Sequence, residues 1–232
     1  MEERLQISDV LEKSINNYVE FTGEIIDKIR FDHKSYKENF FYTRVAAKRL
    51  SGVCDNIPIM IPECLLKEGL DVGKRVRGKG HFESCNIRKY DEKGNPLLSS
   101  YLKLFVFAIE LEVIEDEAEY AKIIVDENII WLDGFLCKEP VYRKTGGQPD
   151  GKDIADLMIA VNRPSKRADY LPSITWKRNA LFARYLEVGD RIQCLGRIQS
   201  RTYTKLQNEA EEPVEKEVYE VSIFKLERVK MD

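Results

Sequence analysis

Aromatic side chains alternate with lysine and arginine along the second half of this sequence. Trp176 stands directly before Lys177 and Arg178, and Tyr203 lies two residues after Arg201. A flat aromatic ring can stack on an exposed nucleobase, and a neighbouring cation can neutralise the phosphate of the same nucleotide. These residue types in this spacing therefore indicate contact with a single-stranded nucleic acid.

The local charge supports this interpretation. Residues 138–205 contain fourteen Lys or Arg and seven Asp or Glu, a local charge of +7, whereas the chain of 232 residues has a formal charge of −3. Binding of a polyanion depends on the local field and not on the average. We expect the binding residues to be Tyr170, Trp176, Tyr203, Arg163, Lys166, Arg167, Lys177, Arg178, Arg201 and Lys205.

The direction in which the aromatic residues point decides their role. Tyr170 and Trp176 are six residues apart, an even number, so on a regular strand they lie on the same face. If that face is the outside of the fold, both rings can stack on bases. If it is the inside, both belong to the core, and the two alternatives remain open at this point.

Patterns typical of enzymes and metal sites are missing from the sequence. The five cysteines form no CxxC pair, and the two histidines are His33 and His81. Zinc sites need paired, closely spaced ligands, and nucleotide-hydrolysing enzymes need a phosphate-binding glycine loop. We therefore expect no enzymatic activity, no cofactor and no metal, with the cysteines reduced as in a cytosolic protein.

No targeting or membrane segment is evident either. The chain has no run of about 18 apolar residues, the length that a membrane-spanning helix requires. The first residues, Met1 to Arg4, lack a basic segment followed by an apolar stretch, which a secretion signal would contain. We expect a cytoplasmic protein without a membrane partner.

The elements that must position the basic and aromatic residues are short strands. Residues 1–16 have apolar residues on one side of an amphipathic helix, and residues 17–114 alternate as strands with turn signals between them. Residues 115–127 are acidic and are expected to connect two domains. Residues 128–232 return to the strand pattern and form the second domain.

The second domain repeats the first. The offset between equivalent residues is about 111 near the start and 116 later. Three pairs of blocks carry the likeness: 17–25 (NYVEFTGEI) with 128–136 (NIIWLDGFL), 57–61 (IPIMI) with 171–175 (LPSIT), and 70–80 (LDVGKRVRGKG) with 186–196 (LEVGDRIQCLG).

Each copy has the element order of an OB-fold, with three strands, a short helix and two further strands. A glycine in the first strand, Gly23 or Gly134, suits a sharply bent barrel corner. The predicted fold class is therefore all-β with short helices, arranged as two tandem OB-fold five-stranded barrels.

The second half resembles the bacterial single-stranded DNA-binding protein family. The likeness covers residues 128–229 and is carried by several blocks in the same order, which are Asn128–Gly134, Lys138–Arg143, Ile159–Arg163, Asp169–Lys177, Ala183–Ile192, Gly196–Tyr203 and Tyr219–Ile223. The resemblance implies a partner, single-stranded DNA, bound without sequence preference in replication, recombination or repair. It also implies that Tyr170, Trp176 and Tyr203 stack on bases, and that two chains pair as a homodimer with four OB-folds.

The chain departs from the family pattern at four places. Pro164 and Ser165 stand where the family has an aromatic residue, and residues 208–217 are strongly acidic. The first copy resembles the family only through the repeat. In that copy, the positions that are equivalent to Tyr170, Trp176 and Tyr203 hold Asn56, Pro62 and Ile87. The chain stops at Asp232 without the acidic tip through which the family recruits enzymes, so we expect no such recruitment.

Two alternatives stay open. A module of this fold can act mainly through protein–protein contacts, as a primosomal or assembly protein. Stacking alone also does not distinguish RNA from DNA, because that distinction needs contacts to the 2′-hydroxyl. For the first copy we expect a structural or dimerising role, with auxiliary phosphate contacts as the alternative.

Overall fold

The computed structural model describes residues 16–91, 94–115, 125–147, 150–205 and 214–230, without the side chains of 203–205, 214 and 215. The predicted helix at 1–16 and most of the predicted connector at 115–127 lie outside the described residues. The first copy contains β1 (Asn17–Ile25), β2 (Arg30–Ser35), β3 (Glu38–Lys48), β4 (Cys54–Pro62), the 3₁₀ turn η1 (Glu63–Leu65), β5 (Arg75–Tyr90) and β6 (Pro96–Val113).

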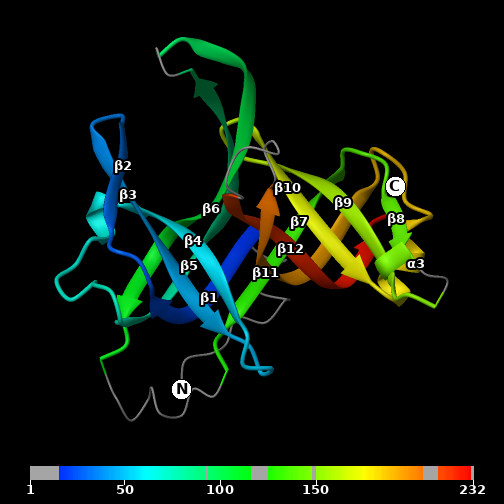
Figure 1. Cartoon of the computed structure of the whole chain (residues 1–232), viewed down its shortest axis with the longest axis horizontal. Coiled ribbons are helices and arrows are strands. Elements are labelled where there is room, and N and C mark those ends of the chain that lie inside the picture. Colours follow the sequence, from blue (N-terminus) through cyan, green and yellow to red (C-terminus); the bar gives the residue numbers. More distant parts are fainter. Residues whose placement is uncertain (1–15, 92–93, 116–124, 148–149, 206–213, 231–232) are drawn as a thin grey trace.

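The second copy follows the same order. It contains β7 (Asn128–Leu136), β8 (Val141–Lys144), the turn η2 (Thr145–Gly147), β9 (Asp153–Asn162), β10 (Ala168–Trp176), the helix α3 (Arg178–Ala183), β11 (Arg191–Lys205) and β12 (Val214–Arg228). Figure 1 shows the two copies side by side, with β1 and β7 between them.

Each copy is a closed five-stranded ring. In the first, β1 pairs with β3 and β5, β3 with β4, β4 in parallel with β6, and β6 with β5. In the second, β7, β9, β10, β12 and β11 form the same ring, with the parallel pair between β10 and β12. These rings are OB-folds, as the strand pattern predicts. The short strands β2 and β8 extend each ring at the outer edges of the sheet.

Two glycines allow the rings to close. A Cβ atom on Gly23 would lie 2.4 Å from the Ala46 carbonyl oxygen, and one on Gly134 would lie 2.6 Å from that of Ala160. Only a residue without a side chain permits this approach of β1 to β3 and of β7 to β9. The prediction that these glycines mark barrel corners is confirmed.

The repeat is also visible in single hydrogen bonds. The Asn17 side-chain amide donates to the Phe82 carbonyl and accepts from the Phe82 N–H, at 2.8 and 2.9 Å. Asn128 makes the same two bonds with Ile198, at 2.8 and 2.9 Å. Each asparagine thus ties the start of its first strand to the fourth strand of the same barrel.

The two barrels join through antiparallel pairing of β1 with β7, from Asn17 opposite Leu132 to Phe21 opposite Asn128. Val19 lies opposite Ile130, its own equivalent in the repeat. An approximate two-fold axis therefore passes between these strands. Val19 and Ile130 are both fully buried, and one apolar cluster runs from the first barrel into the second.

Two buried aspartates strengthen this junction from either side of the axis. Asp169, 1% exposed, accepts the Ser84 N–H at 2.5 Å and the Arg163 Nε–H at 2.7 Å. The Ser84 hydroxyl in turn accepts the Tyr170 N–H at 2.8 Å. Each copy thus satisfies a polar backbone group of the other, which a buried interface requires.

Asp55, the equivalent aspartate of the first copy, makes the corresponding contact with the second copy. Asp55, fully buried, accepts the Ser200 N–H at 3.3 Å and the Arg49 Nε–H at 2.5 Å. The Ser200 hydroxyl accepts the Asn56 N–H at 2.9 Å. We call these two arrangements the reciprocal aspartate contacts.

The described end of the predicted connector also packs on the first barrel. Asp126, 8% exposed, accepts the Thr22 hydroxyl at 3.0 Å and the Lys48 N–H at 2.8 Å, and it pairs with Arg75. Among the described residues, no helix has the length and apolar character that a membrane crossing needs.

Removal of one of the reciprocal aspartate contacts should lower the stability of the fold strongly. Asp169→Ala leaves the Arg163 guanidinium and the Ser84 N–H without their buried partner, so we expect the free energy of unfolding to fall by about 3–5 kcal/mol. The matched control is Asp156→Ala, since Asp156 pairs with Arg143 on the surface with both side chains more than 40% exposed. That change should cost at most about 1 kcal/mol. Urea denaturation measures both, and equal losses would contradict the structural role of Asp169.

A pH dependence follows from Glu83, which pairs with Arg163 at 2.8 Å beside the Asp169 contact. Burial raises the pKa of Glu83 to about 7, although Arg163 opposes the shift. A carboxyl group with a raised pKa stabilises the fold below its ordinary pKa of 4.5, and this stabilisation is lost as the pH rises through about 7.

We therefore expect the free energy of unfolding of the native chain to decline between pH 4.5 and 7 relative to that of Glu83→Gln, which cannot titrate. Denaturation of both proteins at several pH values gives this difference. A difference that stays constant over the range would show that Glu83 does not titrate there.

Candidate nucleic-acid interface

The outward face of β10 carries both predicted stacking residues. Leu171 and Thr175 point into the barrel and are fully buried, whereas Tyr170 is 46% exposed and Trp176 is 36% exposed. Pro172 lies between them on the same face and is half-buried. The alternative of two core aromatics is therefore excluded, and both rings are accessible from solvent.

The backbone sets a cation directly beside Trp176. Lys177 has φ +52° and ψ −124°, a left-handed conformation that is uncommon outside glycine. Its N–H donates to the Asp153 carbonyl at 2.8 Å, and the chain turns there from β10 into α3. Lys177 and Arg178 are both exposed, as the prediction for phosphate contacts requires.

The β9–β10 turn presents two further cations. The Lys166 N–H donates to the Arg163 carbonyl at 3.1 Å, and the Arg163 N–H donates to the Arg167 carbonyl at 2.7 Å. This turn leaves the side chains of Lys166 and Arg167 exposed.

Arg163 contacts residues of both barrels. Its guanidinium bonds Asp169 and the Ser84 carbonyl and pairs with Glu83, so three groups already use its donors. These contacts place Arg163 at the junction between the barrels. The sequence could not show this, because Ser84 and Glu83 lie far from Arg163 along the chain.

Arg201 remains accessible but is paired. Its side chain is 58% exposed, and its Nε lies 3.2 Å from a carboxylate oxygen of Glu220, whose side chain is 9% exposed. Burial raises the pKa of Glu220, and the Arg201 charge opposes that shift. Arg201 is thus held at the surface by a carboxylate beneath it.

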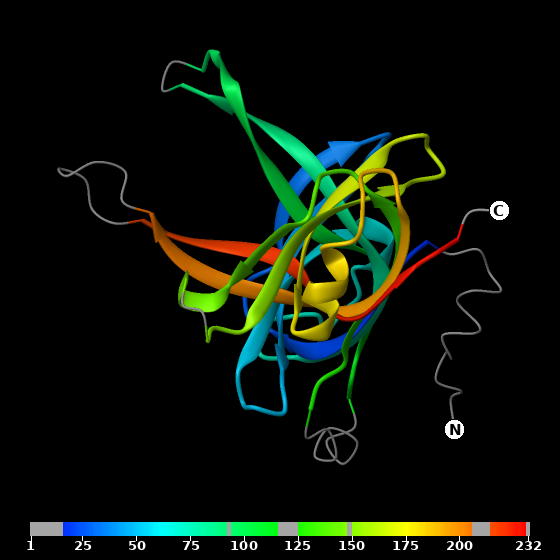
Figure 2. The ribbon, with the colours of Figure 1, turned by 90° about the vertical axis from the view of Figure 1, so that its right-hand side faces the viewer.

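Tyr203 and Lys205 lie at the far end of β11. Tyr203 is opposite Lys216 and Lys205 is opposite Val214 in the β11–β12 hairpin. Their side chains lie outside the described part of the chain, so their predicted roles stay predictions. Figure 2 shows this hairpin and the equivalent β5–β6 hairpin extending away from the barrels.

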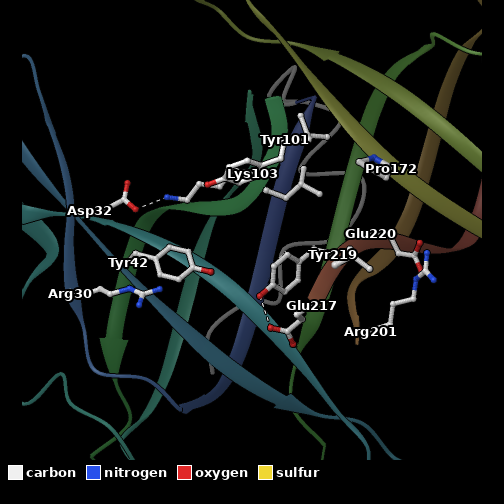
Figure 3. Close-up of a pocket in the computed structure, with 13 residues that line it drawn as sticks. Arg30, Asp32, Tyr42, Tyr101, Lys103, Pro172, Arg201, Glu217, Tyr219 and Glu220 are labelled. Atoms are coloured by element: carbon white, nitrogen blue, oxygen red, sulfur yellow. Dashed lines mark hydrogen bonds and ion pairs between the residues drawn. The ribbon is translucent and has the colours of Figure 1, made fainter. Parts of the chain in front are cut away.

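A groove of about 930 Å³ opens between the two barrels next to this surface. Pro172 and Arg201 line it from the second copy, and Figure 3 shows Tyr42, Tyr101 and Lys103 on the side of the first copy. The predicted set of binding residues missed these three. The repeat offered no signal for them, because the residues equivalent to Tyr42, Tyr101 and Lys103 are Asp156, Lys216 and Val218.

The first copy has no aromatic platform at the family positions. Asn56 and Ile87 are half-buried there, and Pro62 is buried. Among the described residues, no group of three or more His, Cys, Asp or Glu side chains is placed to hold a metal ion.

Comparison with known proteins finds a match for the second copy. Residues 127–228 match the family model of the single-strand binding protein family. No curated protein sequence matches the chain.

Solved structures extend the likeness in fold to both copies. The wild-type single-stranded DNA binding protein from Thermus aquaticus has a TM-score of 0.69 and 19% identity, over 93% of this chain and 94% of that chain. A deletion mutant of the Thermus protein gives the same score and identity, over 93% of this chain and 95% of that chain. The dimeric N-terminal domain of the PriB protein from Thermoanaerobacter tencongensis is 32% identical over 43% of this chain and 98% of that chain, with a TM-score of 0.35.

The tandem barrels thus have the fold of the Thermus protein, and the match at 127–228 lies on the copy that presents Tyr170 and Trp176. Over residues 127–228, the second copy is similar to the single-strand binding protein family.

Proposed function

We propose that this chain binds single-stranded DNA without sequence preference and protects it in replication, recombination or repair. The observation that carries the proposal is the outward face of β10, where Tyr170 and Trp176 stand exposed with cations on either side. The proposed contacts are stacking by Tyr170, Trp176 and Tyr203, and phosphate contacts by Lys166, Arg167, Lys177, Arg178, Arg201 and Lys205. We propose a cytoplasmic binding protein and not an enzyme.

The chemistry explains why such binding tolerates any sequence. Every base offers a flat face to an aromatic ring, so stacking on Tyr170 or Trp176 does not depend on which base is present. The phosphates are identical along the strand, and the cations on α3 and on the β9–β10 turn lie at the two ends of β10. A strand laid along β10 can therefore satisfy both kinds of contact at once.

If Tyr170 and Trp176 stack on bases, truncation of either side chain should weaken the binding of DNA. Trp176→Ala and Tyr170→Ala should each weaken binding of oligo-dT by about 1–3 kcal/mol, which is roughly five- to hundredfold in Kd. Fluorescence anisotropy of a labelled oligonucleotide of about 35 residues at two salt concentrations measures the effect. Binding by the native chain should weaken with salt, because cations contact phosphate.

The control is Tyr185→Ala, since Tyr185 is 76% exposed on the loop after α3 and lies on neither β10 nor the groove. It should leave Kd unchanged. Absence of binding by the native chain at low salt would reject the proposal. Competition with an RNA oligonucleotide in the same assay decides between DNA and RNA.

A second candidate function is a protein-contact module. Apolar side chains around α3 favour it, since Leu181 is 42% exposed and Phe224, beside the helix, is 55% exposed. A chain that acts through protein contacts alone would bind no oligonucleotide, and the anisotropy assay separates that case from the first function.

We also propose that two chains form a homodimer. The chain contains two OB-folds, and a pair of chains would present the four that the family resemblance implies. Sedimentation equilibrium should give about twice the chain mass of 27.0 kDa. A single species at the mass of one chain at micromolar concentration would contradict the dimer.

A further inference from the structure

The groove between the barrels lies at the approximate two-fold axis. Lys103 and Leu104 of β6 line it from the first copy, and their equivalents in β12, Val218 and Tyr219, line it from the second. A perfect repeat would place identical side chains on the two walls. The walls differ, and the difference indicates what the groove can hold.

The wall of the first copy carries two cations around one aromatic ring. The Arg30 guanidinium carbon lies 5.3 Å and the Lys103 Nζ 5.1 Å from the centroid of the Tyr42 ring. Cations at this distance are attracted to the face of an aromatic ring, so Tyr42 fixes both of them at the groove. The second copy has Asp156 and Val218 at the positions of Tyr42 and Lys103, so it cannot form this arrangement.

The acids of the groove are compensated by partners. Glu217 accepts Arg44 at 2.6 Å, the Asn56 amide at 2.6 Å and the Tyr219 hydroxyl at 2.7 Å. Glu220 pairs with Arg201 in the same groove. These carboxylates therefore contribute little net negative charge to a strand in the groove.

The two cations of the first wall, Arg30 and Lys103, can bind a further anion. Asp32 pairs with the Lys103 Nζ, which has two further N–H donors. Arg30 is exposed and forms no salt bridge within the described part of the chain, although its charge helps to lower the pKa of the nearby Asp27. The first wall can thus attract an anion, and the phosphates of a nucleic-acid strand are anions.

The groove is continuous with the stacking surface of the second copy. Pro172, which lies between Tyr170 and Trp176 on the outward face of β10, also lines the groove, and so does Arg201. Tyr101, 49% exposed, stands on the opposite wall. A strand that leaves β10 on this side enters the groove and meets Arg30 and Lys103.

We propose that the first copy binds the sugar–phosphate backbone of the same DNA strand in this groove, through Arg30 and Lys103 positioned by Tyr42. This inference rests on the proposed function of the second copy. The first copy lacks aromatic residues at the positions where the family stacks on bases. It contributes phosphate contacts from other positions, which lie outside the family pattern.

The test uses the full chain with oligo-dT of two lengths. An oligonucleotide of about 8 residues fits within one OB-fold, and one of about 35 residues extends over both. Arg30→Ala with Lys103→Ala should weaken binding of the long oligonucleotide about tenfold or more. The same double change should lower the slope of log K against log salt by about 1.4, because two phosphate contacts are lost. Binding of the short oligonucleotide should stay as in the native chain.

The matched control is Lys67→Ala with Lys225→Ala, which removes the same charge from exposed positions outside the groove. It should change neither the long-to-short affinity ratio nor the salt slope. Asp32→Asn is a second test, because it replaces the negative carboxylate that pairs with the Lys103 Nζ by a neutral amide. It should tighten binding of the long oligonucleotide severalfold, and thermal melting checks that every variant folds.

The outcomes separate the two proposals. If the native chain binds both lengths but neither the double variant nor Asp32→Asn changes the long-to-short ratio, the groove does not hold the strand and this inference is wrong. If the native chain binds neither length, the proposed function itself fails.

Discussion

The pairing of β1 with β7 is the contact on which the rest of the structure depends. It places Val19 opposite Ile130, so the two barrels share one buried cluster and one approximate two-fold axis. Backbone groups buried beside such a junction must find partners, and the reciprocal aspartate contacts supply them. Asp55 binds the N–H of Ser200 and Asp169 that of Ser84, so each copy completes the hydrogen bonding of the other.

This junction also decides which charged residues remain for a ligand. The Arg163 guanidinium bonds Asp169 and pairs with Glu83, whereas the side chains of Lys166 and Arg167 in the same turn stay exposed. The two sides of the junction have diverged, since His81 and Glu83 of the first copy occupy the positions that Arg197 and Gln199 hold in the second. A duplicated chain can change one side alone, which a symmetric pair of identical chains cannot do.

Divergence of the copies divides the binding chemistry between them. The second copy keeps aromatic rings on the outward face of β10, and the first copy places Arg30 and Lys103 on the ring of Tyr42. The groove at the axis joins these two surfaces, so stacking and phosphate contacts can act on one strand. A chain with a net charge of −3 can therefore present a local surface suited to a polyanion.

The sequence by itself determined the features that arise from neighbouring residues. Strand alternation, the glycines at 23 and 134 and the spacing of the repeat predicted two OB-folds, and the clustering of Tyr170 and Trp176 with cations predicted the ligand class. Only the tertiary structure decided that these rings point outward, that Arg163 serves the junction, and that Tyr42 and Lys103 face Arg201 across a groove. These outcomes depend on contacts between residues far apart in the chain, such as Ser84 with Asp169. Local pattern and spacing cannot report contacts of that kind, because the packing of the two barrels brings them together.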